Sequence, residues 1–222
     1  MILRELWRLY QQEIFERPSQ PALFNPYRDA DPSLDVRAAA EIRRSNLRAY
    51  LAAFPERPDT IVIGEAPGPR GGRFTGVPYT SERLYACDGL PFRGRKTSLR
   101  DESCAESTAT IFWNVMRPHF PRFVIWNTVP YHPHRVGEAL SIRTPAASEV
   151  DACLDLMAEA MRIIEPNCIL AVGRIAQHAL NKLNHDFIPI RHPSHGGATE
   201  FERGMQNTFT QINGSVKCIP SS

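Results

Sequence analysis

Four short runs of apolar residues constrain the fold of this chain more than any other feature. They cover residues 60–63, 123–126, 168–172 and 187–190. Nearly every position in each run is apolar, which is typical of strands buried on both faces of a parallel sheet. Segments with helical spacing lie between them, so the sequence predicts an α/β fold: an α/β/α sandwich around a central, mostly parallel four-stranded sheet. In such folds ligands bind at the carboxyl ends of the strands.

Apolar residues at helical spacing predict the helices that flank this sheet. The first is expected from Leu3 to Ile14. A second is expected to start at Asp31-Pro32, a capping residue followed by proline, and to end at Phe54. Two more are expected over 148–164 and 174–183. With 222 residues the chain fits one domain, 1–222. We divide it into N-terminal helices (1–55), an arginine-rich insertion (88–108) and a loose tail (213–222).

Composition excludes several classes of protein. Hydrophobic residues make up 42% and charged residues 23%, as in ordinary globular proteins. No apolar run approaches the ~18 residues of a membrane-spanning helix. Arg4, Glu5 and Arg8 interrupt the first apolar stretch, unlike a signal peptide, so we expect a cytoplasmic protein without membrane contact. Five cysteines without a C-x-x-C pair argue against a disulfide framework and a zinc site.

Positive charge is clustered although the net charge is only +2. Residues 107–137 contain no acid, and residues 91–100 hold Arg93, Arg95, Lys96 and Arg100, also without an acid. Such clustering is typical of nucleic-acid binding, and a solvated basic face is the alternative. His132 and His134 could pair on a metal, but no third ligand is evident, so two surface imidazoles are the favoured interpretation.

Polar residues follow three of the predicted strands. The loop 64–72 after the first strand contains four glycines, whose backbone can approach a ligand closely, but it matches neither common nucleotide-binding loop. Asn127 follows the second strand, and His192 follows the fourth. Because the carboxyl ends of parallel strands meet at one edge, we expect this amide and this imidazole near the glycine loop. A turn-capping Asn and a structural His are the alternatives.

Three motifs together resemble those of the uracil-DNA glycosylase superfamily, over about residues 57–201. They are Gly64-Glu65-Ala66-Pro67-Gly68, the Asn127 that ends a strand, and Arg191-His192-Pro193-Ser194. The first motif and Tyr79 are most similar to the bacterial iron-sulfur branch. That branch holds its cluster with four cysteines, and only Cys153 falls where one would lie. We therefore expect no cluster, no other cofactor and no metal.

The resemblance implies roles for individual residues. Asn127 would read the base, Tyr79 would stack on it, Gly64 and Ala66 would line its pocket, and His192 would donate to a base oxygen. Ala66 stands where well-known members carry a water-activating Asp, which leaves Glu65 as the nearest substitute. Gly68 stands where they carry a Tyr that excludes thymine. Contacts to DNA are expected from Gly68, Arg70, Ser194, His195, Gly196, Arg93, Arg95, Lys96 and Arg100. Family members usually carry an apolar side chain after the last motif that enters the DNA minor groove as a wedge. Here His195-Gly196-Gly197 follows that motif, so no such wedge is expected there.

The predicted activity is monofunctional hydrolysis of uracil from DNA, which leaves an abasic site that the protein can retain tightly. Its expected partners are uracil-containing and abasic DNA, and we expect a monomer. Two alternatives stay open. A broader glycosylase would also release hypoxanthine or xanthine, which the small Gly68 would permit. A weakly catalytic protein would instead bind and shield abasic DNA.

Overall fold

The four predicted strands form one parallel sheet in a computed structural model that describes residues 2–214. The strand order is β3-β2-β5-β6. The strands are β2 (Thr60–Gly64), β3 (Phe123–Asn127), β5 (Cys168–Val172) and β6 (Ile188–Ile190). In the register of β2 and β3, Gly64 at the end of β2 is level with Asn127 at the end of β3. The predicted α/β fold is therefore confirmed, including the parallel sheet.

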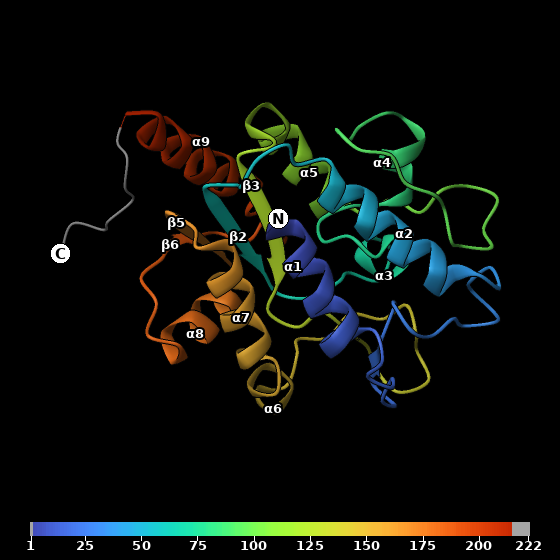
Figure 1. Ribbon diagram of the computed structural model, residues 1–222. Coiled ribbons are helices and arrows are strands. Elements are labelled where there is room, and N and C mark those ends of the chain that lie inside the picture. The colour runs from blue at the N-terminus through green and yellow to red at the C-terminus, as the bar shows by residue number, and fades with distance from the viewer. Residues whose placement is uncertain (1, 215–222) are drawn as a thin grey trace.

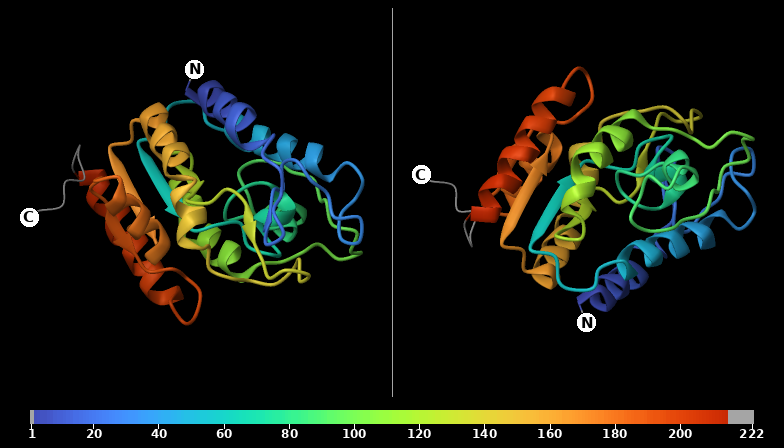
Figure 2. Two further views of the ribbon diagram at one scale, coloured as in Figure 1. Left: turned by 90° about the horizontal axis from the view of Figure 1, so that it is seen from below. Right: turned by 90° about the horizontal axis from the view of Figure 1, so that it is seen from above.

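Helices cover both faces of this sheet, and α1 and α7 lie on the opposite side from α9 (Figures 1 and 2). Helix α5 packs against α9, and α1 packs against α7. The helices are α1 (Ile2–Leu9), the π-helix η1 (Tyr10–Ile14), α2 (Ala39–Ala52), α3 (Gly72–Thr75), α4 (Glu82–Ala86), α5 (Ser107–Met116), the 3-10 helix η2 (Arg117–His119), α6 (Ala147–Asp151), α7 (Leu154–Ile164), α8 (Arg174–Lys182) and α9 (Ala198–Gly214). A two-stranded sheet pairs β1 (Leu23–Phe24) with β4 (His132–Pro133).

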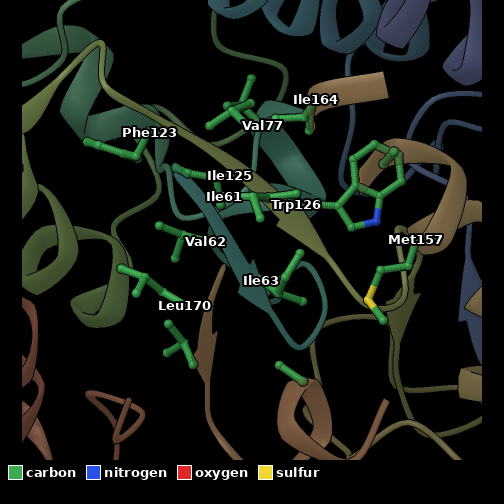
Figure 3. Packing of buried hydrophobic residues seen from close by; sticks show 14 of the residues in the cluster. Ile61, Val62, Ile63, Val77, Phe123, Ile125, Trp126, Met157, Ile164 and Leu170 are labelled. Atoms are coloured by element: carbon green, nitrogen blue, oxygen red, sulfur yellow. The ribbon is translucent and has the colours of Figure 1, made fainter. Parts of the chain in front are cut away.

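The core forms around strand β2, which is buried along its whole length. Side chains of β2, β3, β5 and α7 gather there (Figure 3). Successive residues of a strand point to opposite faces, so β3 contributes to both layers. The ring of Trp126 lies 5.1 Å from Tyr10 on one face, and the ring of Phe123 lies 5.8 Å from Phe112 of α5 on the other. This double burial explains why the strands are apolar throughout, and it fixes the edge where the polar residues lie.

The second helix begins at Ala39, so the predicted start at Asp31-Pro32 is wrong. Asp31 instead accepts hydrogen bonds from the backbone and hydroxyl of Ser33 in a local turn. The following residues pair with a distant segment: the Val36 N–H donates to the Thr97 carbonyl, and the Leu99 N–H donates to the Leu34 carbonyl. These tertiary hydrogen bonds use backbone groups that a longer helix would have needed.

The other helical predictions are confirmed with changes at their ends. The helix expected over 148–164 divides at Ala152–Cys153 into α6 and α7. Helices α5 and α9 were not anticipated from the sequence, although Phe201, Met205 and Phe209 of α9 are buried at helical spacing. The tail expected to be loose from residue 213 is still helical at 213 and 214, and residues 215–222 lie outside the described part of the chain. Within residues 2–214, every helix is too short or too polar to cross a lipid bilayer.

Candidate functional site

A cavity of about 1030 Å³ opens at the carboxyl ends of the parallel strands. The sheet order places Asn127 at the end of β3, Gly64 at the end of β2, Gly173 after β5 and His192 after β6. The polar residues predicted from the sequence therefore come from the two outer strands, and the two glycines lie between them. Side chains that line the cavity include Glu65, Ala66, Tyr79, Glu106, Asn127 and His192.

Asn127 and Tyr79 converge above Gly64. A Cβ at Gly64 would lie 2.6 Å from Tyr79 Cε2 and 2.9 Å from Asn127 Oδ1, so only glycine fits there. The Asn127 side chain is nearly buried, with the residue 5% exposed. The Tyr79 ring stacks on Phe112, with centroids 4.6 Å apart, and its hydroxyl is buried without a hydrogen-bond partner among the described residues. Tyr79 also has a φ of +52°, and such backbone strain is concentrated at functional sites.

The imidazole of His192 lines the same cavity as Asn127. Its ring centroid is 6.3 Å from that of Tyr79, and a Cβ at Gly173 would lie 3.4 Å from the His192 Cβ. The backbone N–H of Ser194 donates to Nδ1 at 3.2 Å, and the Ser194 hydroxyl lies 2.7 Å from the same atom. Because an N–H only donates, Nδ1 has no proton, and the proton of the neutral ring is on Nε2.

The environment of His192 keeps the ring neutral. Burial, followed by the charges of Arg191 and His195, lowers its pKa to about 4. At neutral pH the side chain is therefore an uncharged Nε2–H donor. His195 and Gly196, which follow it, are exposed and have positive φ angles of +52° and +76°. Ser194, which we expected to contact DNA, uses its hydroxyl and its N–H on His192.

Two carboxyl groups line the cavity, and the sequence pointed to only one of them. Glu65 is half-buried, and burial raises the pKa of its carboxyl. Glu106 lies immediately before α5, and its carboxyl accepts hydrogen bonds from the Thr108 hydroxyl (2.9 Å) and the Arg70 N–H (3.3 Å). Burial also raises the Glu106 pKa. Glu106 gave no distinct signal, because an acid before a helix is a common capping residue.

The carboxyl of Glu106 fills the space beside Gly68. A Cβ at Gly68 would collide with both carboxyl oxygens, and a Cβ at Gly71 would lie 2.7 Å from Cδ and Oε2. The space beside Gly68 is therefore occupied by a residue from a distant part of the chain. This occupant was invisible in the sequence, since 38 positions separate the two residues. The acceptance of hypoxanthine or xanthine stays a prediction.

The arginine-rich insertion is an ordered loop held by one buried acid. Glu82, 1% exposed, accepts hydrogen bonds from the backbone of Thr97, Ser98 and Cys104 and from the Ser98 hydroxyl, at 2.6–3.0 Å. This leaves Arg93, Arg95 and Arg100 exposed. The Lys96 ammonium donates to the carbonyl oxygens of Arg100 and Asp101, so it also stabilises the loop itself.

The rim of the cavity carries further basic residues. Arg70 was expected there and is exposed. Arg174 and Arg191 also line the cavity and are exposed, although neither was expected from the sequence to contact DNA. The cavity lining also includes an apolar rim formed by Leu140 and Ile142, and Ile142 is 69% exposed.

The possible metal pair His132 and His134 is used structurally. His132 is fully buried, with Nδ1 2.7 Å from the Pro67 carbonyl oxygen and Nε2 3.2 Å from that of Ala139. Burial lowers its pKa to about 4. Cys153 is buried in the core, where burial raises the pKa of its thiol to about 11. Across residues 2–214 no three His, Cys, Asp or Glu side chains are grouped closely enough to hold a metal ion.

Comparisons with known proteins agree with this fold. The family model of the uracil DNA glycosylase superfamily matches residues 51–214. The crystal structure of wild-type SMUG2 from Pedobacter heparinus is similar, with a TM-score of 0.68, at 14% sequence identity, over 96% of this chain and 99% of that one. No curated protein sequence matches the chain. Since the family model covers most of its length, the chain belongs to the uracil DNA glycosylase superfamily and is a DNA glycosylase.

Proposed function

We propose that the protein hydrolyses the N-glycosidic bond of uracil in DNA and leaves an abasic site. One observation carries this proposal: a carboxamide, an aromatic ring and a neutral imidazole, from distant parts of the chain, line a single cavity. A base in a duplex must leave the stack, at a cost of a few kcal/mol, before an enzyme can act on it. The cavity would receive this extruded base.

Asn127 would provide the selectivity. The edge of uracil presents a carbonyl acceptor beside a ring N–H donor, and one carboxamide can pair with both. Cytosine reverses both groups, so donor would face donor and acceptor would face acceptor. A buried site built on such hydrogen bonds rejects the wrong partner by ~10⁴ or more, because buried polar groups would stay unpaired. The burial of Asn127 against Gly64 and Tyr79 satisfies this requirement.

His192 would stabilise the leaving base. Breaking the glycosidic bond leaves negative charge on uracil, so a donor aimed at its oxygen stabilises the transition state more than the ground state. The Ser194 N–H fixes the proton on Nε2 and orients the ring, so no reorganisation is needed during the reaction. Tyr79, already stacked on Phe112, would provide the flat surface beneath the base, a contribution of about 1–3 kcal/mol.

Glu65 would position the water that attacks the sugar, since it is the carboxyl of the first motif and lines the cavity. Because Glu65 is half-buried, its carboxyl would be partly shielded from bulk solvent. No lysine is found among the described residues that line the cavity, so no Schiff base is available there. This favours a monofunctional glycosylase, which leaves the DNA strand intact.

The rim would bind the duplex. Arg70, Arg174 and Arg191 line the cavity and are exposed, so their guanidinium groups would contact phosphates of the duplex. Ile142 would enter the base stack, since apolar side chains that unstack DNA project from protein surfaces in this way. Its neighbour Arg143 anchors the loop through two contacts of 2.7 Å to Glu149 and one of 2.6 Å to the Ala22 carbonyl oxygen. The wedge missing after the last motif would thus be provided by another loop.

A base-release assay tests the proposal. Oligonucleotides with a single uracil opposite adenine or guanine, or in a single strand, are incubated in excess over the protein, and free base is quantified. We expect the wild type to release free base, with a slow phase after the first equivalent if the abasic product is retained. A protein that only binds abasic DNA releases no free base at any concentration, and that result would reject the proposed activity. Uracil, hypoxanthine and cytosine substrates compared in parallel define the base range.

A further inference from the structure

We propose that Glu106 forms the wall of the base pocket that faces the 5-position of the bound pyrimidine, and that it determines which 5-substituents the enzyme accepts. This inference rests on the proposed function, because it takes the cavity to be a pyrimidine pocket. It adds a specificity-determining residue that lies outside the three sequence motifs.

The carboxyl of Glu106 is held in place by the glycine loop and by two hydrogen bonds. Gly68 and Gly71 press against it from one side, so closely that a Cβ on either would collide with it. The Thr108 hydroxyl and the Arg70 N–H hold its oxygens. Glu106 directly precedes helix α5, whose Phe112 supports the Tyr79 ring. The wall and the stacking surface are therefore parts of one rigid unit.

The reading groups orient the base so that its 5-position faces this wall. In uracil, O2, N3 and O4 follow one another around one side of the ring, while C5 and C6 form the opposite edge. With Asn127 on N3 and O4, His192 on O2 and Tyr79 on the ring face, the C5–C6 edge faces away from both reading groups. Asn127 lies beside Gly64, whereas the Glu106 carboxyl lies further along the same loop, beside Gly68 and Gly71, and also lines the cavity. C5 would therefore lie against this wall.

The chemistry of the carboxyl disfavours an apolar substituent at C5. The Glu106 carboxyl is half-buried, so water can still reach it, and an apolar group pressed against it removes that water at a cost. A hydrogen at C5 leaves this space free, whereas a methyl group fills it. Thymine would therefore be rejected by both volume and polarity.

The experiment compares the release of thymine from a T·G mismatch with the release of uracil from a U·G mismatch. We expect Glu106→Ala, which removes the wall, to raise the thymine-to-uracil ratio by about 10- to 200-fold, the usual range for one methyl-sized change in a pocket. Glu106→Gln keeps the volume of the side chain and a polar end group. Its thymine-to-uracil ratio should therefore stay within about threefold of the wild-type ratio. Glu102→Ala, an exposed acid of the neighbouring loop, is the matched control and should leave the ratio unchanged.

Three results would overturn the inference. One is an unchanged ratio in a folded Glu106→Ala protein that still releases uracil. Another is loss of uracil release in both Glu106 variants at an unchanged unfolding temperature, because that would place the carboxyl in the chemical step. If Glu106→Ala fails to fold, Thr108→Val takes its place, because it frees the carboxyl without removing it. This variant should raise the thymine-to-uracil ratio severalfold. An unchanged ratio in Thr108→Val would be the third result. A wild type that releases no uracil would instead refute the proposed function.

Discussion

The polar residues at the strand ends and those in the arginine-rich loop differ in charge and in exposure to water. At the strand ends, Asn127 and His192 are uncharged and largely withdrawn from water, and the register of the sheet fixes their positions. In the loop, Arg93, Arg95 and Arg100 are charged and exposed, and a single buried acid, Glu82, holds the backbone that carries them.

If the proposed function holds, this difference indicates how the recognition of base and DNA backbone is divided within the molecule. Reading a base requires fixed, desolvated donors and acceptors, because an unpaired buried group is costly. Holding a DNA backbone requires accessible charge, whose effect is independent of sequence and weakens with salt. Substitutions at the strand ends should therefore change base selectivity and rate, while substitutions in the loop should change affinity and salt dependence.

The largest effect is expected at Asn127. Asn127→Ala removes both hydrogen bonds to the base, so the preference for uracil over cytosine should fall from ~10⁴ or more toward unity, mainly through loss of uracil release. Single-turnover base release measures both rates. The salt dependence of DNA binding should stay as in the wild type. A variant that keeps wild-type selectivity would contradict the assigned role of the carboxamide.

His192→Ala should lower the rate of base release by ~10²–10³, the usual effect of losing one well-aimed donor in a transition state. Glu65→Ala should cost less if the water is held by several groups. Both variants are compared under single-turnover conditions, with unfolding temperatures as the control for structure. A larger loss for Glu65→Ala would reverse the relative importance that we assign to these two residues.

The acid sensitivity of His192 follows from its lowered pKa. Its ordinary pKa of about 6.5 applies to the unfolded chain, and the folded value is about 4. The stabilisation from the neutral ring is thus complete above pH 6.5 and is lost as the pH falls from 6.5 to 4. NMR titration should find the ring still neutral at about pH 5.5, between these two values. A midpoint near 6.5 would show that the ring is not buried as described.

Glu82→Gln tests whether one acid organises the basic loop. The amide would bring its own N–H donors against donors of the loop, and we expect the free energy of unfolding to fall by about 2 kcal/mol. Chemical denaturation measures this change. Glu102→Gln, at an exposed acid nearby, should change stability by less than about 0.5 kcal/mol. Equal effects of the two variants would show that the hydrogen bonds of Glu82 do not hold the loop.

A triple variant, Arg93→Ala with Arg95→Ala and Arg100→Ala, tests whether the loop binds DNA. The slope of log affinity against log salt concentration should decrease by about 0.9 for each phosphate that the variant no longer neutralises. Base selectivity should not change. Adding Lys96→Ala should have little further effect, because its ammonium is bound within the loop. An unaltered slope in the triple variant would mean that the loop is only a solvated insertion.

The smallest effect is expected at the apolar rim. Ile142→Ser should slow uracil release from duplex DNA by about three- to tenfold and leave single-stranded substrate unaffected, because only a duplex must be unstacked. Val136→Ser is the matched control: Val136 is 71% exposed in the same loop but does not line the cavity. If both variants slow base release from the duplex equally, Ile142 has no special role.

The sequence predicted the sheet, its parallel direction and most of the groups at its edge. The apolar runs carried this information because doubly buried strands have no polar face. It predicted the start of α2 wrongly, because the hydrogen bonds that hold residues 34–36 come from Thr97 and Leu99. It did not anticipate that Lys96 is bound to carbonyl oxygens of its own loop or that Glu106 lines the cavity, because both depend on loop conformations that have no periodic pattern.

The sequence alone therefore determined the architecture and the candidates Asn127, Tyr79 and His192, since these follow from strand pattern, strand ends and motif order. Only the tertiary structure decided what surrounds them: that Gly64 lets Asn127 and Tyr79 meet, that Ser194 fixes the proton of His192, and that Glu106 fills the space beside Gly68. The physical reason is that periodicity and motifs encode local geometry. The shape and polarity of a cavity depend on side chains brought together from distant parts of the chain.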